Sequence, residues 1–157
     1  MRNILRNVFI IILAAVAVSI FGFAQAALAD THYVSPSGSY TWTQSTNIAT
    51  PTSAQIAMAN AVAGDIVLFR GGTYNVGQPP ADYHGALEPS HSGSPGNYIT
   101  FMAYPGETPV MNGTARTTGG DTDQGTVFGT NGQSYIIFDG FTIQANNGTK
   151  IGRIIIW

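Results

Sequence analysis

Two carboxylates in a glycine-rich loop are the sequence's best candidate for metal chemistry. Asp121 and Asp123 form a D-x-D pattern between Gly119-Gly120 and Gly125. A loop of this kind can turn both carboxylates toward one cation, and calcium prefers oxygen ligands. Calcium takes about six to eight oxygens, however, so two carboxylates alone do not make a site. A solvated loop is the main interpretation, and no metal ligand is assigned.

Two histidines share a long polar insertion, residues 75–95, which is rich in Pro, Gly and Ser. His84 and His91, with Asp82 and Tyr83, could form a lip that contacts a sugar. Zinc needs a third protein ligand, and none stands close to this pair in the sequence. The insertion is therefore interpreted as a functional or mobile loop without metal.

One arginine ends the most apolar strand of the chain. Arg70 follows Ile66-Val67-Leu68-Phe69 and could bind an anionic sugar, but pairing with Asp65 or with the carbonyls of the following corner is the simpler expectation. Asp139, in the corner Phe138-Asp139-Gly140, is interpreted as a turn former because aspartate tolerates unusual backbone angles.

Tyrosines and two asparagines complete the candidates. The tyrosines are expected to pack in the core or at corners, although an exposed subset could stack on sugar rings: Tyr33, Tyr74, Tyr98, Tyr104 and Tyr135. Asn112-Gly113-Thr114 and Asn147-Gly148-Thr149 match the glycosylation sequon, which matters only in a eukaryotic secretory pathway. Both asparagines are better explained as corner formers.

Short strands separated by Gly, Asn and Asp corners must position these groups. Residues 66–69 are apolar on both faces, which predicts a strand buried on both faces. Tyr98-Ile99-Thr100-Phe101 is echoed by Tyr135-Ile136-Ile137-Phe138 at an offset of 37 residues. Further strands are expected at residues 32–35, 109–111 and 153–156. The pattern favours a solenoid of stacked strands, with a β-sandwich as the competitor.

Residues 52–63 are the one convincing helix after the N-terminal region. A capping box from Thr52 to Gln55, or Thr50 as the cap with Pro51 in the first turn, would begin it, and Gly64 would end it. The expected buried stripe of this helix consists of Ile56, Ala59, Val62 and Ala63.

The N-terminus has the pattern of an export signal. Arg2 and Arg6 precede an apolar run, residues 8–23, and small residues follow, so residues 1–29 are interpreted as a signal peptide cleaved after Ala29. Cleavage after Ala26 and retention as an anchor are the alternatives. Residues 30–157 then form one secreted domain, extracellular or periplasmic, with no membrane association after cleavage.

Charge and cysteine content limit the partners of this domain. Eight carboxylates against four remaining cations leave a net charge of about −4, the wrong sign for a nucleic-acid or anionic-membrane surface. With no cysteine, the domain has neither disulfides nor thiolate metal sites and must be stabilised by its core.

Several stretches together resemble the N-terminal coils of secreted right-handed parallel β-helix proteins, and in particular pectate-lyase-like polysaccharide lyases. The stretches are Tyr33-Val34-Ser35-Pro36-Ser37-Gly38, Ala63-Gly64-Asp65, Arg70-Gly71-Gly72-Thr73-Tyr74, Ser92-Gly93-Ser94-Pro95-Gly96-Asn97-Tyr98-Ile99-Thr100, Ala103-Tyr104-Pro105-Gly106-Glu107 and Phe138-Asp139-Gly140-Phe141. The resemblance implies an all-β right-handed parallel β-helix with an N-terminal capping α-helix. It also implies an inward-facing set: Val67, Phe69, Ile99, Phe101, Ile136, Phe138, Phe141 and Ile143.

The function that the resemblance implies is binding or β-elimination of an acidic, uronic-acid-containing polysaccharide, with calcium as the cofactor of the full-length parent. The alternative is a non-enzymatic surface protein or adhesin. No catalytic or substrate-binding residue is carried over, because no motif of those families' active sites occurs in the chain. Ile154-Ile155-Ile156-Trp157 ends on an apolar strand, so we expect a C-terminally truncated piece that has no lyase activity and no cofactor by itself.

Overall fold

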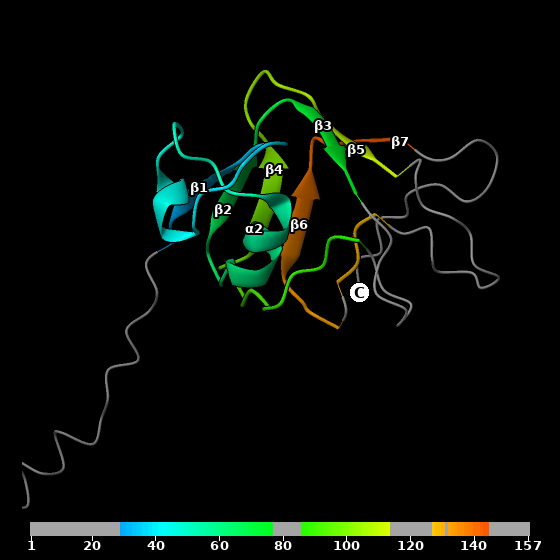
Figure 1. The fold of residues 1–157 in the computed structure, drawn as a ribbon. Helices are drawn as coiled ribbons and strands as arrows, with labels where there is room; N and C mark the ends of the chain where they lie inside the picture. The colour runs from blue at the N-terminus through cyan, green and yellow to red at the C-terminus, as the bar shows by residue number, and fades with distance from the viewer. Residues whose placement is uncertain (1–28, 77–85, 114–126, 131, 145–157) are drawn as a thin grey trace, which may run out of the picture.

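The computed structural model describes residues 29–76, 86–113, 127–130 and 132–144 (Figure 1). These residues form two parallel sheets, of four and three strands, with one α-helix and one 3-10 helix. The larger sheet has the order β1-β2-β4-β6 and the smaller one β3-β5-β7. The elements are β1 (Thr31–Val34), η1 (Thr43–Thr46), α2 (Ala54–Asn60), β2 (Ile66–Phe69), β3 (Gly72–Asn75), β4 (Ile99–Ala103), β5 (Pro109–Asn112), β6 (Ile136–Asp139) and β7 (Thr142–Gln144).

The chain alternates between the two sheets. After β2, β4 and β6 it turns a short corner and enters β3, β5 and β7, so each sheet gains one strand per passage. Ile99 pairs with Ile136 and Phe101 with Phe138, which confirms the predicted echo at 37 residues as a structural register. The strands predicted around residues 32–35, 66–69, 98–101, 109–111 and 135–138 are present, with ends shifted by a residue or two.

The core lies on the inner face of the four-stranded sheet, where every second side chain points. His32, Val67, Phe101 and Phe138 share one row across its strands, and Phe101 and Phe138 stack with ring centroids 5.4 Å apart. The predicted inward set is buried at Val67, Phe69, Ile99, Phe101 and Ile136. Its other members, Phe138, Phe141 and Ile143, are partly buried and pack against the same cluster.

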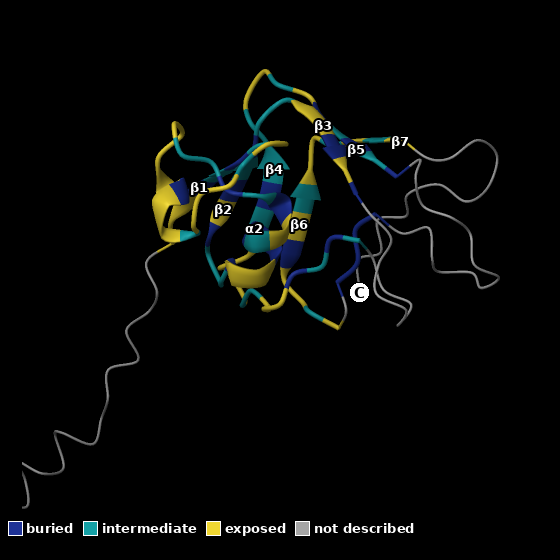
Figure 2. Ribbon diagram, viewed as in Figure 1, coloured by how far each residue is buried: buried dark blue, intermediate teal, exposed yellow. Residues whose placement is uncertain are grey.

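The outer face of the four-stranded sheet corrects one prediction. Buried and exposed positions alternate along β2, so Val67 and Phe69 are buried while Ile66 is 41% exposed and Leu68 is half-buried (Figure 2). The expectation that this strand is buried on both faces is therefore wrong. Four consecutive apolar residues therefore do not indicate that both faces of a strand are covered by other elements.

The predicted fold class is also corrected. Instead of an all-β right-handed parallel β-helix with a capping helix, the described residues form two small parallel sheets with strands of three to five residues, together with α2 and η1. The rest of the core is lined by α2 and by the segments around Leu87 and Phe128, which meet through one isolated bridge. The echo at 37 residues did predict the pairing of β4 with β6 correctly.

Helix α2 is shorter than predicted and presents a different face. Ser53 is its N-cap and accepts a hydrogen bond from the Ile56 N–H, because Thr52 is occupied elsewhere: its hydroxyl donates to the Tyr40 carbonyl. The backbone turns extended at Ala61, so the helix ends before Gly64. Its buried residues are Ala54, Ala57 and Met58, whereas Ile56 is half-buried and Ala59 exposed, which overturns the predicted stripe.

Several predictions fall outside the described residues. The segment predicted as a signal peptide lies there except for Ala29, as do the strand expected at residues 153–156 and the C-terminal end. Within the described part of the chain, no helix is both long and apolar enough to cross a membrane.

Candidate functional site

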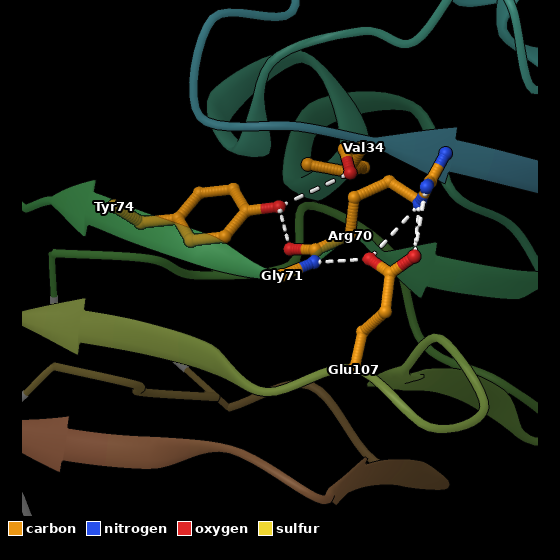
Figure 3. Close-up of polar contacts among 5 residues, drawn as sticks. All are labelled: Val34, Arg70, Gly71, Tyr74 and Glu107. Carbon is orange, nitrogen blue, oxygen red and sulfur yellow. Dashed lines mark hydrogen bonds and ion pairs between the residues drawn. The ribbon is translucent and has the colours of Figure 1, made fainter.

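The corner that follows β2 holds the first candidate, Arg70, and its partner differs from the predicted one. The Arg70 Nη2 lies 2.7 Å from Glu107 Oε1, and its Nε donates to both carboxylate oxygens at 2.9 and 3.0 Å (Figure 3). Glu107 Oε2 also accepts a hydrogen bond from the Gly71 N–H. Glu107 belongs to the next corner of the chain, so the pair joins two corners.

Charge compensation is close to complete at this corner. Hydrogen bonding to Glu107 raises the pKa of Arg70, and the same hydrogen bonds, with that of Gly71, lower the pKa of Glu107. The Arg70 guanidinium carbon also lies 4.9 Å from the centre of the Tyr104 ring. Tyr74, buried beneath, donates its hydroxyl to the Arg70 carbonyl at 2.8 Å. The guanidinium therefore joins the two corners, and its charge is compensated by Glu107.

Asp65, the predicted partner of Arg70, is buried near the other end of β2. Its carboxylate accepts hydrogen bonds from the Val62 N–H at 2.9 Å and the Asp30 N–H at 3.1 Å. Both bonds tie the entry of β2 to neighbouring segments. Asp65 is therefore a structural carboxylate rather than a reactive one.

The remaining predicted candidates are scattered. Asp121, Asp123 and His84 lie outside the described residues, and His91 is exposed. Asp139 is exposed at the end of β6 beside Gly140, whose φ of 76° fits the predicted corner. Within the described part of the chain, no three His, Cys, Asp or Glu residues group as metal ligands.

Asn112, predicted as a corner former, is instead the last residue of β5. Its side-chain amide donates to the Asn75 Oδ1 at 2.9 Å, so the two amides stack across paired strands of the three-stranded sheet. The other sequon asparagine, Asn147, lies outside the described residues.

A buried histidine was missed by the sequence reasoning. His32 stacks on Trp42 with ring centroids 3.4 Å apart, and its Nδ1 lies 2.8 Å from the Ser45 hydroxyl. Because that hydroxyl donates to the Trp42 carbonyl, the His32 Nδ1 is the donor toward Ser45. Burial lowers the pKa of His32, and the opposing charges of Asp65 and Asp30 do not offset it. The sequence could have indicated that His32 is buried, because His32 and the apolar Val34 are two residues apart in a strand and therefore lie on the same face.

The outer face of the four-stranded sheet carries two exposed tyrosines that contact each other. Tyr98 and Tyr135, which directly precede β4 and β6, are 44% and 43% exposed, with ring centroids 5.8 Å apart. Next to them lies the row Thr31, Ile66, Thr100 and Ile137, whose members are paired across the strands. A second row contains Tyr33, Leu68, Met102 and Asp139. We call these residues the outer-face strip.

Tyr135 has an unusual backbone within this strip. Its φ of 59° makes it the one non-glycine residue with positive φ among those that the structure describes. Its carbonyl accepts the Ile99 N–H at 3.0 Å, and a Cβ on Gly93 would clash with that carbonyl. A bulky side chain in this conformation costs on the order of 1 kcal/mol or more, and such outliers concentrate at functional sites.

The strip can bind but offers little for catalysis. It presents aromatic and apolar side chains with hydroxyls of Tyr and Thr, and Asp139 at one end is its charged member. The sequence matches no family model, and no curated protein or solved structure matches it. The functional argument therefore depends on the geometry of the strip.

Proposed function

We propose that this protein binds a carbohydrate chain on the outer-face strip, with Tyr98 and Tyr135 as the main contacts. The observation that carries the proposal is the contact between two exposed tyrosines, one of which has a costly left-handed backbone. An amphipathic ring with a polar tip suits a ligand that is apolar on its ring faces and polar at its edges, as sugars are.

The neighbouring residues fit the same type of ligand. Ile66 and Ile137, 41% and 40% exposed, continue the apolar surface beside the tyrosines. Thr31 and Thr100 alternate with them in the same row and offer hydroxyls that can both donate and accept hydrogen bonds. A sugar chain lying on this row would meet apolar contact and hydrogen-bonding groups in alternation.

The strained backbone of Tyr135 suggests that its side chain serves binding and not the stability of the fold. Glycine, asparagine and aspartate adopt positive φ more readily than tyrosine does. A residue chosen for stability alone at this position would be one of these. The tyrosine is therefore explained by what its ring contacts on the outside of the sheet.

Binding, rather than cleavage, is the activity that the described residues support. Arg70 is the one lysine or arginine among them, and its guanidinium is held by Glu107. A β-elimination needs a base in reach of the proton and a counter-charge for the uronate, and the strip supplies neither. An extracellular polysaccharide agrees with the export signal predicted for residues 1–29, which stays a prediction.

The test is a binding assay with the full chain and a matched pair of variants. Tyr135→Asn removes the ring and keeps a residue that tolerates positive φ, while Tyr40→Asn removes a tyrosine of equal exposure, 43%, from the segment before η1. Binding to immobilised oligosaccharides should weaken about tenfold or more in Tyr135→Asn, the equivalent of about 1.4 kcal/mol, and stay unchanged in Tyr40→Asn.

Stability measured on the same samples separates binding from folding. The melting temperature of Tyr135→Asn should equal or exceed that of the unaltered protein, because the substitution relieves backbone strain. A melting temperature lowered by several degrees, or an affinity that does not change, would show that Tyr135 has a packing role and would contradict the proposal.

A further inference from the structure

The two exposed tyrosine rings do not share a plane. Tyr98 and Tyr135 meet edge to face, with an interplanar angle of 69°. At the far end of the strip, Tyr33 and Tyr104 are also tilted, by 49°, with ring centroids 6.3 Å apart. A flat ligand surface laid on the strip could therefore contact the face of only one ring in each pair.

This tilt discriminates between physical forms of a polysaccharide. The surface of a crystalline polymer is flat and rigid, so it can contact the faces of several aromatic rings at once only where those rings lie in one plane. A single chain in solution can twist and place one sugar in the notch between two tilted rings. One ring then packs on the face of that sugar and the other closes its side, a contact that a flat crystal cannot make.

The charge around the strip discriminates between neutral and acidic polymers. The described residues include five carboxylates, Asp30, Asp65, Glu88, Glu107 and Asp139, and one cationic side chain, Arg70. Arg70 is paired with Glu107, and Asp139 belongs to the strip itself. Among the described residues, the carboxylate of Asp139 would repel a uronic-acid chain on the strip, and Arg70, which lies over Tyr104 at the far end, is already paired with Glu107. An uncharged chain carries no charge for Asp139 to repel.

We infer that the ligand of the outer-face strip is a single, soluble chain of uncharged sugars, and that neither a crystalline polysaccharide surface nor a uronic-acid polymer is its preferred ligand. This inference depends on the proposed function and makes it more specific. It rests on the angle between the tyrosine rings and on the pairing of Arg70.

The experiment compares three classes of ligand on the full chain. The soluble neutral probes are hexasaccharides of β-1,4-linked glucose, xylose and mannose and of α-1,4-linked glucose, titrated by calorimetry. The acidic probe is an oligogalacturonate of the same length, at low and at moderate salt. The crystalline probes are microcrystalline cellulose and chitin, in a pull-down assay. Tyr135→Asn and Tyr98→Ala locate the binding, and Tyr40→Asn is the control.

The expected result is binding of at least one neutral hexasaccharide, weakened about tenfold or more in both site variants and unchanged in the control, with no retention on crystalline polymer. Retention on cellulose or chitin that the site variants abolish would overturn the inference and leave the proposed function standing. Preference for the oligogalacturonate, weakened by salt, would overturn the neutral-ligand part in the same way. Failure of all probes, or binding that survives both site variants, would overturn the proposed function itself.

Discussion

Replacing Phe101 by alanine tests the core on which the outer-face strip is built. Phe101 is fully buried on the inner face of β4, in register with Val67 on one side and Phe138 on the other. Its ring stacks on Phe138 at 5.4 Å and meets Phe69 edge-on at 6.5 Å. No other side chain of β4 joins both neighbouring strands through aromatic contacts in the described part of the chain.

The loss of stability expected for Phe101→Ala follows from the full burial of its side chain. A fully buried phenylalanine cut back to alanine costs about 3–5 kcal/mol, the sum of lost apolar transfer and of the cavity left behind. Domains of this size have a total stability of about 5–15 kcal/mol, so the variant loses about a fifth of it or more. The melting temperature should fall by more than about 10 °C.

Urea denaturation followed by circular dichroism measures this loss. Met102→Ala is the matched control, because Met102 is the next residue of β4, lies half-buried on the outer face and should cost less than half as much. The double variant with Phe138→Ala should show a coupling of about 0.5–1.5 kcal/mol between the stacked rings. A Phe101→Ala loss below about 1 kcal/mol, or equal losses at positions 101 and 102, would refute the assignment of inner and outer faces.

Three further changes probe the corner and the buried histidine. Tyr74→Phe deprives two backbone carbonyls of a hydroxyl donor and should cost about 1 kcal/mol in urea denaturation; a neutral result would mean that water replaces it fully. Glu107→Gln removes the charge that pairs with Arg70 and should lower the melting temperature in low salt, with a smaller loss in high salt; equal losses would argue against an ionic contribution. The folded-state pKa of His32 lies below its unfolded value of about 6.5, so the stability of the protein should be constant above that pH and fall as the pH drops through it. His32→Gln should flatten this part of the stability profile. If the variant keeps the same slope, another group causes the effect.

Strand positions were predictable because their signal is local. The resemblance to parallel β-helix proteins implied that Val67, Phe69, Ile99 and Phe101 point inward, and the structure buries all four. The same signal could not show what covers the second face of a strand. Ile66 is as apolar as its buried neighbours, and its exposure depends on the absence of a covering layer among the described elements, which alternation does not encode.

Helix and ion-pair predictions failed for a related reason. The buried face of α2 depends on where the helix begins. Thr52 does not cap the helix, because its hydroxyl donates a hydrogen bond to the Tyr40 carbonyl, 12 residues away in the sequence. Arg70 was expected to pair with Asp65, five positions away in the sequence, or with the carbonyls of the following corner, whereas its partner Glu107 is 37 positions away and adjacent in space. Both errors favoured neighbours in the sequence over neighbours in the sheet.

Tyr98 and Tyr135 look equivalent in the sequence, and the difference between them is the strongest argument for a ligand. They precede paired strands at the same offset of 37 residues, yet only Tyr135 has a left-handed backbone among the described non-glycine residues. Two neighbours impose that backbone: the Ile99 N–H holds the Tyr135 carbonyl, and Gly93 leaves room for it. Since the main chain sets the conformation whatever the side chain, folding alone would favour asparagine or glycine at position 135. The tyrosine at this position is best explained by its exposed ring, which lies against the ring of Tyr98 on the outer face of the sheet, where the two rings together can contact a ligand.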